Sequence, residues 1–301
     1  MKIAIVGGSG FIGRHTAQEL REHGHDVTIF DKVEGVDALD MDKLYYAFKR
    51  SLPFDAVYMF AAISDSKENL TDIQYAVHTN IMCLTNTLKV CECFNIPRII
   101  FSSTVWVYSV SQSEYNTEEN MLPITESDHI YTTCKLACES IVKNYCAVRD
   151  IDYTILRYGI AYGPDCHPDM ILSKFITNAL NGKKLIITGN GDTFRNFLYV
   201  TDHARGNRLA LDDAARNQII NLEGPEKVTL KEVAARVKEL HSKDTTIIFT
   251  SERHGDYKGK HVSNSKAKSL LDWEPKVSFK EGSKQLYEYI KKNINSSAAC
   301  R

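Results

Sequence analysis

The sequence has no excess of charge of either sign, because its 301 residues include 37 lysines and arginines against 38 aspartates and glutamates. Proteins that bind nucleic acid or anionic membranes usually carry a strong positive charge, so neither partner is expected. Long hydrophobic runs are also missing, since stretches such as IAIVGG and AVYMFAAI have only the length of a strand. The apolar start, MKIAIVGG, is too short for a signal peptide. We therefore predict a cytoplasmic protein without a membrane span.

Cysteine is not scarce, but the spacings typical of metal sites are absent. The eight cysteines are at positions 83, 91, 93, 134, 138, 146, 166 and 300. They form no CxxC pair, and no cysteine–histidine group has the spacing of a zinc finger. Most fall in apolar helical patterns, where cysteine behaves as a small hydrophobic residue. We expect buried, reduced thiols and no metal site.

The sequence does contain an alternation of short apolar runs and longer amphipathic ones. Strands are predicted at 2–7, 26–30, 56–61, 98–103, 153–157 and 218–224. Helices are predicted at 11–23, 41–50, 69–94, 130–149, 229–240, 265–271 and 279–293, and another begins near Thr201 or Asp202. Alternating strands and helices favour a parallel sheet covered on both faces. The predicted fold is an α/β, Rossmann-type, doubly wound sheet with a smaller C-terminal lobe.

A glycine-rich turn, IAIVGGSGFIG, connects the first strand to the first helix. Gly8, Gly10 and Gly13 fit G-x-G-x-x-G, and Gly7, Gly10 and Gly13 fit G-x-x-G-x-x-G. Such glycines let the backbone turn tightly and approach a pyrophosphate, while the helix N-terminus offers free N–H groups. The turn alone is a weak signal, but its place between a strand and a helix predicts a dinucleotide site.

An acidic residue ends the second strand, HDVTIFD. Asp31 lies eighteen residues after Gly13. A carboxylate at about this distance accepts hydrogen bonds from the adenosine ribose and repels a 2′-phosphate. Lys32 would attract such a phosphate, but we expect the carboxylate to dominate. NAD is therefore predicted as the cofactor in preference to NADP.

The segment HIYTTCKLACESIV places Tyr131 and Lys135 four residues apart on a predicted helix, and hence on one face of it. A free tyrosine has a pKa of about 10 and is a poor base at neutral pH. A nearby lysine stabilises the phenolate and lowers that pKa, so Tyr131 is a candidate general base. Ser102, Ser103 and Thr104 add hydroxyl groups at the carboxyl end of a strand, where such folds bind ligands. Only this combination indicates catalysis, since the tyrosine–lysine spacing alone is common.

Together these motifs resemble the extended short-chain dehydrogenases/reductases, and within them the NAD-dependent epimerase/dehydratase family that acts on nucleotide sugars. The likeness runs nearly end to end. It is carried by GGSGFIG, DALD at 37–40, MFAA at 59–62, Asn80, FSSTVWVY, YTTCK, LRYGIAYGP, GNGDTFRNFLYVTD, RHGDYKG and LLDWEPKVSFKEG. The resemblance implies an NAD-dependent enzyme whose substrate is a nucleotide-diphosphate sugar.

The resemblance also implies roles for individual residues. The catalytic positions are matched by Thr104, Tyr131 and Lys135. The cofactor-binding positions are matched by Gly7, Gly10, Phe11, Ile12, Gly13, Asp31, Lys32, Asp37, Ala38, Leu39, Phe60, Ala61, Ala62, Asn80, Ser102, Tyr131, Lys135 and Tyr158. The substrate-binding positions are matched by Ser103, Thr104, Arg195, Arg253 and Asp256. An arginine suits a diphosphate because its planar fork bonds two oxygens at once.

The motifs exclude only some of the reactions that the family catalyses. The 4,6-dehydratases of the family carry Asp-Glu directly after the catalytic threonine, whereas Val105 and Trp106 follow Thr104 here and cannot do acid–base work. The leading hypothesis is a 4-epimerase, in which the sugar is transiently oxidised and then reduced from its other face. An NAD(P)-dependent dehydrogenase or reductase is the alternative, favoured by Ile160 where the family often has asparagine. A remote alternative is a non-catalytic dinucleotide sensor.

Further departures leave the sugar and the nucleotide open. Asn196 and His254 stand where the family usually has aspartate and proline. His167, in a predicted loop, is a weaker candidate for a second acid/base.

The resemblance also bears on assembly and domains. Related proteins pair helices like those at 69–94 and 130–149 across a two-fold axis, which implies a homodimer. The NAD-binding domain is expected at 1–165, rejoined by about 196–222, and residues 166–301 are expected to form mainly the substrate lobe.

Overall fold

The computed structural model describes residues 1–64, 71–127, 129–241, 245–251 and 259–299. The chain forms two compact units, each built from three stretches of sequence. The first unit contains Met1–Tyr158, His203–Leu222 and His261–Trp273. The second contains Gly159–Asp202, Glu223–Lys260 and Glu274–Arg301. The chain therefore returns to the first unit twice, at 203–222, which lies within the predicted range 196–222, and again at 261–273.

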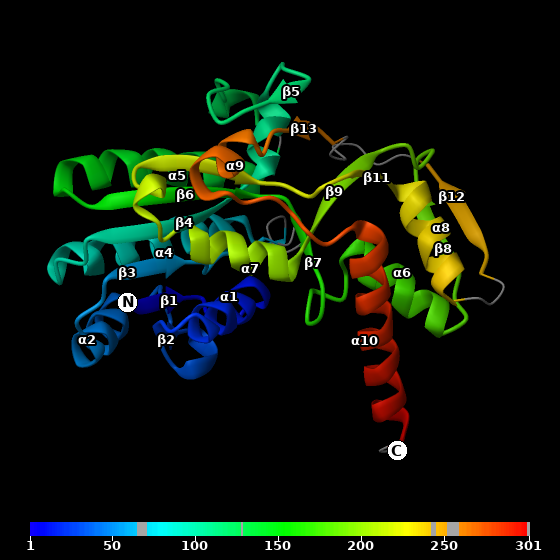
Figure 1. Cartoon of the computed structure of the whole chain (residues 1–301), viewed down its shortest axis with the longest axis horizontal. Coiled ribbons are helices and arrows are strands. Elements are labelled where there is room, and N and C mark those ends of the chain that lie inside the picture. Colours follow the sequence, from blue (N-terminus) through cyan, green and yellow to red (C-terminus); the bar gives the residue numbers. More distant parts are fainter. Residues whose placement is uncertain (65–70, 128, 242–244, 252–258, 300–301) are drawn as a thin grey trace. The chain divides into compact units, whose positions relative to one another are not determined.

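A six-stranded parallel sheet forms the centre of the first unit (Figure 1). Its strands are β1 (Lys2–Val6), β2 (Asp26–Phe30), β3 (Ala56–Met59), β4 (Arg98–Thr104), β6 (Asp152–Tyr158) and β10 (Gln218–Leu222). Their order is β10-β6-β4-β3-β1-β2, and every neighbouring pair is parallel. The direction of winding reverses between β1 and β3, which opens a crevice at the carboxyl ends of these strands. The predicted doubly wound sheet is confirmed.

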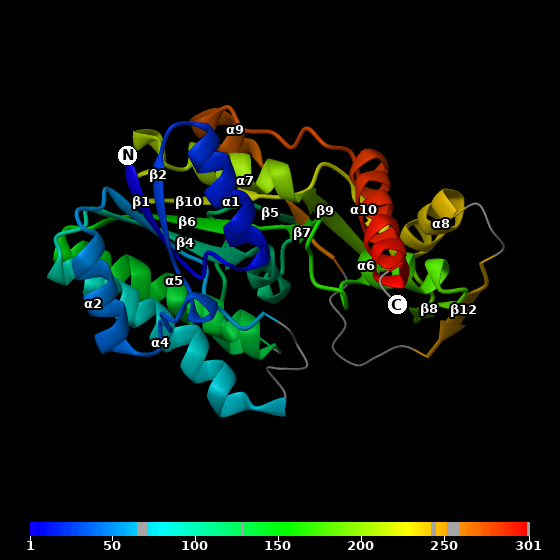
Figure 2. The same ribbon diagram turned by 90° about the horizontal axis from the view of Figure 1, so that it is seen from below.

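Helices cover both faces of this sheet (Figure 2). The helices of this unit are α1 (Phe11–Glu22), α2 (Met41–Ser51), α4 (Ile73–Cys93), α5 (Ile130–Arg149), α9 (Ser265–Leu271) and, from His203 onward, α7 (Val200–Leu209). On one face, α4 packs against both α2 and α5. On the other face, α7 lies along α1, and Asn207 Nδ2 donates a hydrogen bond to Thr16 Oγ1 at 2.7 Å.

Local sequence explains where helices begin and why the sheet is buried. Asp40 and Asp72 precede α2 and α4, and their side chains accept hydrogen bonds from the N–H groups of Lys43 at 3.0 Å and Tyr75 at 2.9 Å. Such caps satisfy donors that the helix itself leaves unpaired. Strand β4, RIIFSST, is buried along its whole length, as a strand covered on both faces requires.

The second unit has its own core. Its elements are β7 (Ile160–Tyr162), β8 (Leu185–Thr188), β9 (Phe194–Tyr199), β11 (Lys227–Thr229), β12 (Ile247–Thr250), α6 (Ile171–Leu180), α8 (Leu230–His241) and α10 (Phe279–Ala299). Strand β9 lies between β11 and β7, and β8 pairs in parallel with β12. Phe175, Phe197 and Phe279 belong to the hydrophobic cluster that the helices and strands enclose.

The sequence predicts the long elements well and the short ones poorly. The predicted strands of the first unit and most of the long helices are confirmed to within a few residues at their ends, whereas the last helix, predicted at 279–293, continues to Ala299. The predicted helix at 69–94 begins at Ile73, and residues 69 and 70 lie outside the described part. Short additional elements are β5 (Tyr115–Asn116), β13 (His261–Val262), and the 3₁₀ helices η1 (Lys32–Glu34), η2 (Val105–Val110), η3 (Ile124–Glu126) and η4 (Asp213–Ala215).

Most of the cysteines are buried, as expected. The buried free thiols are those of Cys83, Cys91, Cys134, Cys138 and Cys146. Cys166 is half-buried, and the expected burial is wrong for Cys93, which is exposed at the last residue of α4. Cys300 lies outside the described residues.

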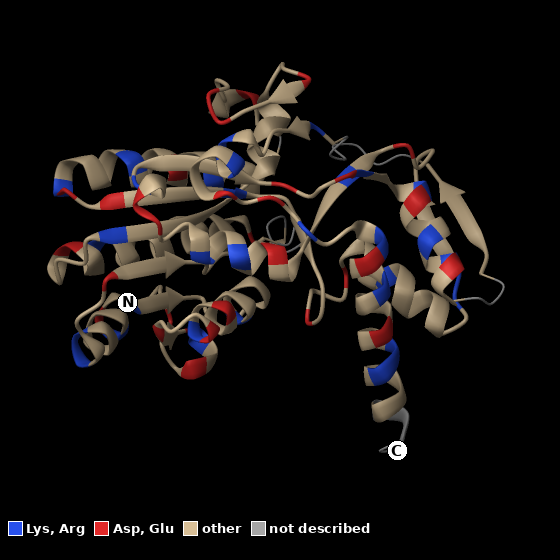
Figure 3. Cartoon of the chain, in the orientation of Figure 1, with Lys and Arg blue, Asp and Glu red and all other residues tan. Residues whose placement is uncertain are grey.

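Charged side chains of both signs are interspersed along the surface elements of each unit (Figure 3). Among the helices that the structure describes, none combines the length and the apolar character that crossing a membrane demands.

Candidate active site

A cavity of about 300 Å³ lies in the first unit, at the carboxyl ends of the strands where the winding reverses. Its walls come from the loops after β1, β2 and β3 and from one face of α4. The lining residues are Gly7, Ser9, Gly10, Phe30, Asp31, Lys32, Val33, Val36, Asp37, Ala38, Leu39, Phe60, Ala61, Ala62, Ile63, Tyr75, Thr79 and Cys83. Ten of the predicted cofactor-binding residues are thus brought to one cavity: Gly7, Gly10, Asp31, Lys32, Asp37, Ala38, Leu39, Phe60, Ala61 and Ala62.

The glycine turn is shaped by close contacts that a side chain would prevent. Gly7 has a φ of 82°, and a Cβ there would lie 2.4 Å from the backbone nitrogen of Ala61. A Cβ on Gly13 would lie 2.6 Å from the Gly7 carbonyl oxygen, so this glycine lets α1 pack against the turn. A Cβ on Gly10 would meet only that same oxygen, at 3.5 Å. The space beside Gly10, the N-cap of α1, suits a phosphate at the helix N-terminus.

Asp31 ties this turn to the end of β2. Its Oδ2 accepts a hydrogen bond from the Ser9 N–H at 3.0 Å, and its Oδ1 accepts one from the Val33 N–H at 3.1 Å. The carboxylate is therefore held in place where it lines the cavity. Each of its oxygens has room for a further hydrogen bond, so ribose hydroxyls can bind as well. This set of groups fits the adenosine and pyrophosphate parts of NAD.

Two asparagines of α4 clamp the loops that line the cavity. Asn80 Oδ1 accepts a hydrogen bond from the Ile63 N–H at 2.9 Å, and its Nδ2 donates to the Ile63 carbonyl at 3.1 Å. Asn86 Nδ2 donates to the carbonyl oxygens of Ala38 at 2.9 Å and Leu39 at 3.2 Å. Asn80 was predicted as a cofactor residue, and its amide is occupied by the loop after β3. Asn86 was not predicted, although an amide in an apolar stretch of helix is a signal for a buried polar role.

Lys135 lies deep in the unit, beside the ring of Tyr131. Its Nζ donates a hydrogen bond to the Ser102 carbonyl at 2.7 Å and lies 4.7 Å from the ring centroid of Phe101 and 5.6 Å from that of Tyr131. Burial lowers the pKa of Lys135 to about 8. Burial also raises the pKa of Tyr131 above its ordinary value. In the protein without cofactor, burial therefore acts against the lowering of the Tyr131 pKa that the sequence predicts.

The hydroxyl groups at the end of β4 are used differently from one another. Ser102 Oγ donates to the Met59 carbonyl at 2.9 Å, which links β4 to β3. Ser103 Oγ donates to Glu139 Oε1 at 2.5 Å. Thr104 Oγ1 accepts a hydrogen bond from the Trp106 N–H at 3.2 Å, so its own proton is left for another acceptor. The roles of Ser103 and Thr104 toward a substrate stay predictions.

A buried ion pair, not predicted from the sequence, supports this strand end. Glu139 follows Lys135 by one turn on α5. Its carboxylate accepts hydrogen bonds from Arg157 Nε at 2.9 Å and from Arg157 Nη2 at 2.7 Å. Arg157 Nη1 also donates to the Tyr108 hydroxyl at 2.9 Å. Glu139 thereby connects α5, β4 and β6. The spacing of four residues from Lys135 to Glu139 is a signal in the sequence that these side chains share a face of the helix.

Tyr158, at the end of β6, is buried with its hydroxyl turned toward α7. The hydroxyl donates to Asn207 Oδ1 at 2.6 Å, and the phenol ring packs on the imidazole of His203. The predicted cofactor residues Phe11 and Ile12 form the first turn of α1 and are half-buried. None of these three lines the cavity of about 300 Å³, and their roles stay predictions.

The remaining predicted substrate residues belong to the second unit. Arg195 lies in β9, and its Nη1 donates to the Phe194 carbonyl at 2.8 Å. Ile160 begins β7, and His167 is exposed in a loop, where its Nδ1 accepts a hydrogen bond from the Asp169 N–H at 3.2 Å. Arg253, His254 and Asp256 lie outside the described residues.

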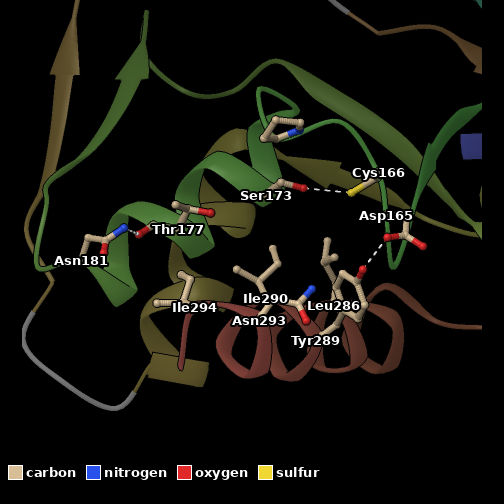
Figure 4. Close-up of a pocket in the computed structure, with 11 residues that line it drawn as sticks. Asp165, Cys166, Ser173, Thr177, Asn181, Leu286, Tyr289, Ile290, Asn293 and Ile294 are labelled. Atoms are coloured by element: carbon tan, nitrogen blue, oxygen red, sulfur yellow. Dashed lines mark hydrogen bonds between the residues drawn. The ribbon is translucent and has the colours of Figure 1, made fainter. Parts of the chain in front are cut away.

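The second unit contains a larger cavity of about 680 Å³ between α6 and α10 (Figure 4). The Tyr289 hydroxyl donates to Asp165 at its rim, and Cys166 Sγ lies 2.9 Å from Ser173 Oγ. None of the predicted site residues lines it. In the part of the chain that the structure describes, no group of three or more His, Cys, Asp or Glu side chains is arranged to hold a metal ion.

Comparison with known proteins agrees with this geometry. The model of the NAD dependent epimerase/dehydratase family matches residues 3–222. A putative UDP-glucose 4-epimerase of Methanocaldococcus jannaschii is 29% identical, covering 97% of this chain and 99% of the relative. A UDP-N-acetyl-alpha-D-glucosaminuronate decarboxylase of Bacillus cytotoxicus is 26% identical, covering 97% of this chain and 98% of the relative.

A similar structure is that of UDP-glucuronic acid 4-epimerase from Bacillus cereus in complex with UDP-glucuronic acid and NAD. It superimposes with a TM-score of 0.86 at 29% identity, covering 97% of this chain and all of that one.

Proposed function

The chain belongs to the NAD-dependent epimerase/dehydratase family, and we propose that it is an NAD-dependent epimerase that inverts C4 of a nucleotide-diphosphate sugar. The observation that carries the proposal is the cavity in which the glycine turn, Asp31 and the acidic segment with Asp37 meet. These are the groups that an adenosine diphosphate requires. Relatives and structural neighbours named as UDP-sugar 4-epimerases, similar over almost the whole chain, support the choice of reaction.

The protein's own residues handle the proton. Tyr131, as the phenolate, takes the proton of the sugar's C4 hydroxyl and returns it after the sugar has turned over. Thr104 hydrogen-bonds to the same hydroxyl and orients it. Lys135, with a pKa of about 8, is mostly protonated at neutral pH and favours the phenolate by its charge. When bound, NAD supplies the acceptor that takes hydride from the sugar carbon and gives it back.

The second unit supplies the contacts to the nucleotide in this proposal. Arg195 binds the diphosphate, and Arg253 and Asp256 remain predicted contacts from outside the described residues. The protein is proposed to act in the cytoplasm as a homodimer through α4 and α5. Support for the dimer comes from Met82 on α4, an apolar side chain that is 37% exposed. Light scattering on the eluting peak of a sizing column tests this assembly.

The first test is to denature the purified protein and identify any released nucleotide by absorbance and mass spectrometry. The second is to incubate it with UDP-glucose or UDP-glucuronic acid and to follow C4 inversion by proton NMR. Retained NAD together with formation of the 4-epimer is the expected result. A site that exchanges its cofactor, with net formation of NADH, would overturn the proposal in favour of a dehydrogenase.

The same NMR assay decides against a decarboxylase. Because relatives of similar identity are named as decarboxylases, release of carbon dioxide from UDP-glucuronic acid would reassign the reaction. Conversion of UDP-glucuronic acid to its 4-epimer without loss of carbon is the result that the proposal requires.

A further inference from the structure

Helix α5 carries the proposed general base in its first turn. The helix begins at Ile130, one residue before Tyr131. The first turn is the least firmly held part of a helix, because its N–H groups have no partner within the helix. The position of the Tyr131 side chain therefore depends on what fixes the start of α5.

The start of α5 lacks the kind of cap that α2 and α4 have. Asp40 and Asp72 precede those helices, and their carboxylates accept hydrogen bonds from N–H groups of the first turn. His129 has the corresponding position before α5, and within the described part of the chain its side chain makes no such hydrogen bond. Its carbonyl accepts the Thr133 N–H at 3.0 Å, but this bond is internal to the segment. Contacts with another element are therefore needed to hold this end of α5 in place.

A ring contact joins this end of α5 to the end of β4. The imidazole of His129 meets the indole of Trp106 edge to face, with centroids 5.3 Å apart and planes inclined by 75°. Aromatic rings favour this geometry, which stabilises them beyond simple burial. Trp106 belongs to η2, which follows β4 directly, and both residues are half-buried. These two side chains are called the ring pair below.

Each member of the ring pair is two residues away from a proposed catalytic residue. The Trp106 N–H donates to Thr104 Oγ1 at 3.2 Å. His129 precedes Tyr131 by two residues. In the proposed reaction Thr104 and Tyr131 bind one hydroxyl, so the separation of their side chains has to be kept. A displacement of about 1 Å at such a site can cost about 100-fold in rate.

Apolar packing holds α5 against η2 further along the helix. The cluster between them consists of one residue from α5 and four from η2: Leu136, Val105, Val107, Tyr108 and Val110. Leu136 lies five residues after Tyr131, which is more than one helical turn. A helix held at Leu136 can still move at its first turn. The ring pair adds an attachment at the end of the helix that carries the phenol.

We propose that the ring pair positions the proposed general base, because it holds the first turn of α5 against η2 so that Tyr131 and Thr104 reach the same hydroxyl. Trp106 and His129 are positioning residues, and neither transfers the proton. This inference rests on the proposed function in one respect, that Tyr131 and Thr104 act together on a sugar hydroxyl.

The kinetic test compares His129→Ala, which removes the ring, with His129→Phe, which keeps a ring but cannot bind a proton. The substrate is UDP-glucose or UDP-glucuronic acid, whichever the unmodified protein epimerises. His129→Ala is expected to lower kcat about 10-fold, while KM and the Kd of NAD change less than about 2-fold. His129→Phe is expected to stay within about 3-fold of the unmodified protein. An equal loss of kcat in both variants would overturn the proposal, since the imidazole itself would then move a proton.

A double-mutant cycle tests whether the two rings act as one unit. Trp106→Ala is expected to lower kcat by about the same factor as His129→Ala, and the double variant by no more than about that factor. Losses that multiply would overturn the pair, because each ring would then act by itself. The matched control is Tyr115→Leu, which breaks the stacking of an exposed ring on His261 in the same unit. Its kcat is expected to change less than about 2-fold.

Hydrogen exchange tests the anchoring of α5 without any substrate. The Thr133 amide closes the first turn of the helix, and its exchange can be followed by NMR. His129→Ala is expected to speed this exchange about 5- to 10-fold, and His129→Phe to leave it nearly unchanged. Equal exchange rates in all three proteins would overturn the proposal. If His129→Ala does not fold, His129→Leu serves for the same measurements.

The two proposals fail in different ways. An unmodified protein that does not epimerise would overturn the proposed function, while faster exchange in His129→Ala would still support the anchoring of α5 by the ring pair. An unmodified protein that epimerises, with His129→Ala equally active, would overturn only the positioning role. A lower melting temperature of His129→Ala at an unchanged kcat would show that the ring pair serves the fold alone.

Discussion

The imidazole of His203 packs on the phenol ring of Tyr158, with ring centroids 4.0 Å apart and planes inclined by 58°. His203 is fully buried, and among the described residues neither of its ring nitrogens has a hydrogen-bond partner. Burial lowers its pKa to about 3. The ring therefore stays neutral in the folded protein over the whole physiological range.

This histidine is expected to make stability fall in acid. Below pH 6.5 the unfolded chain binds a proton at His203 that the folded chain does not bind until about pH 3. Stability therefore decreases as the pH falls through this window, by about 1.4 kcal/mol per pH unit for one group. The variant His203→Leu should lose this contribution, measured by urea unfolding between pH 6.5 and 4.5. The control is His167→Gln in an exposed loop, and an unchanged pH slope in His203→Leu would contradict the prediction.

Glu223 is expected to have the opposite pH dependence. Burial raises the pKa of its carboxyl to about 8, and Gly159 is packed so closely that a Cβ there would lie 2.2 Å from Glu223 Oε1. Between pH 4.5 and 8 the unfolded chain releases a proton that the folded chain retains, so stability decreases as the pH rises.

Replacing Glu223 with glutamine should therefore stabilise the protein increasingly from pH 5 to pH 8, by about 1.4 kcal/mol per unit at most. Urea unfolding at each pH measures the effect, with Glu288→Gln on the exposed side of α10 as the control. Parallel pH curves for Glu223→Gln and the unmodified protein would refute the argument.

The ion pair of Glu139 and Arg157 is expected to be sensitive to the loss of one partner. Both side chains are almost completely buried, so Glu139→Gln leaves a cation without its counter-charge and should cost about 3–5 kcal/mol of stability. Replacing both residues with methionine should cost clearly less than the summed costs of Glu139→Met and Arg157→Met, because no buried charge remains in the double variant. Urea unfolding of the four proteins provides the measurement, and additive losses would count against this account.

Removal of the Tyr131 hydroxyl should separate chemistry from cofactor binding. Tyr131→Phe deletes the proposed general base and is expected to reduce turnover about 10²- to 10⁴-fold, while the Kd of NAD changes little. Tyr145→Phe is the matched control, since its hydroxyl lies later on the same helix and bonds to Glu92. Near-normal epimerisation by Tyr131→Phe would mean that another group moves the proton.

The sequence was sufficient for the sheet and for the cofactor cavity because both depend on local patterns. Apolar runs mark strands that are buried on both faces, and the spacing from Gly13 to Asp31 marks the turn and the following strand end. These residues lie close together in the chain, so their relation in space follows from their spacing.

Other features depend on packing between distant segments and were not predictable. Lys135 donates a hydrogen bond to the backbone carbonyl of Ser102, and a pattern of side-chain types cannot predict a contact with the backbone. Tyr158 directs its hydroxyl to Asn207, forty-nine residues later in the chain. Strands β8 and β12 are each four residues long and pair across a gap of about sixty residues, so neither carries a strong pattern alone.

The clamps from α4 have a consequence for engineering the cofactor preference. Asn80 and Asn86 hold only backbone atoms, those of Ile63, Ala38 and Leu39. Every amino acid except proline presents the same backbone groups, so exchanging these loop side chains leaves the clamps intact. A library of substitutions in the two loops would therefore change the side chains that line the cavity. The path of the loop backbone would stay the same, because the asparagines of α4 still hold it.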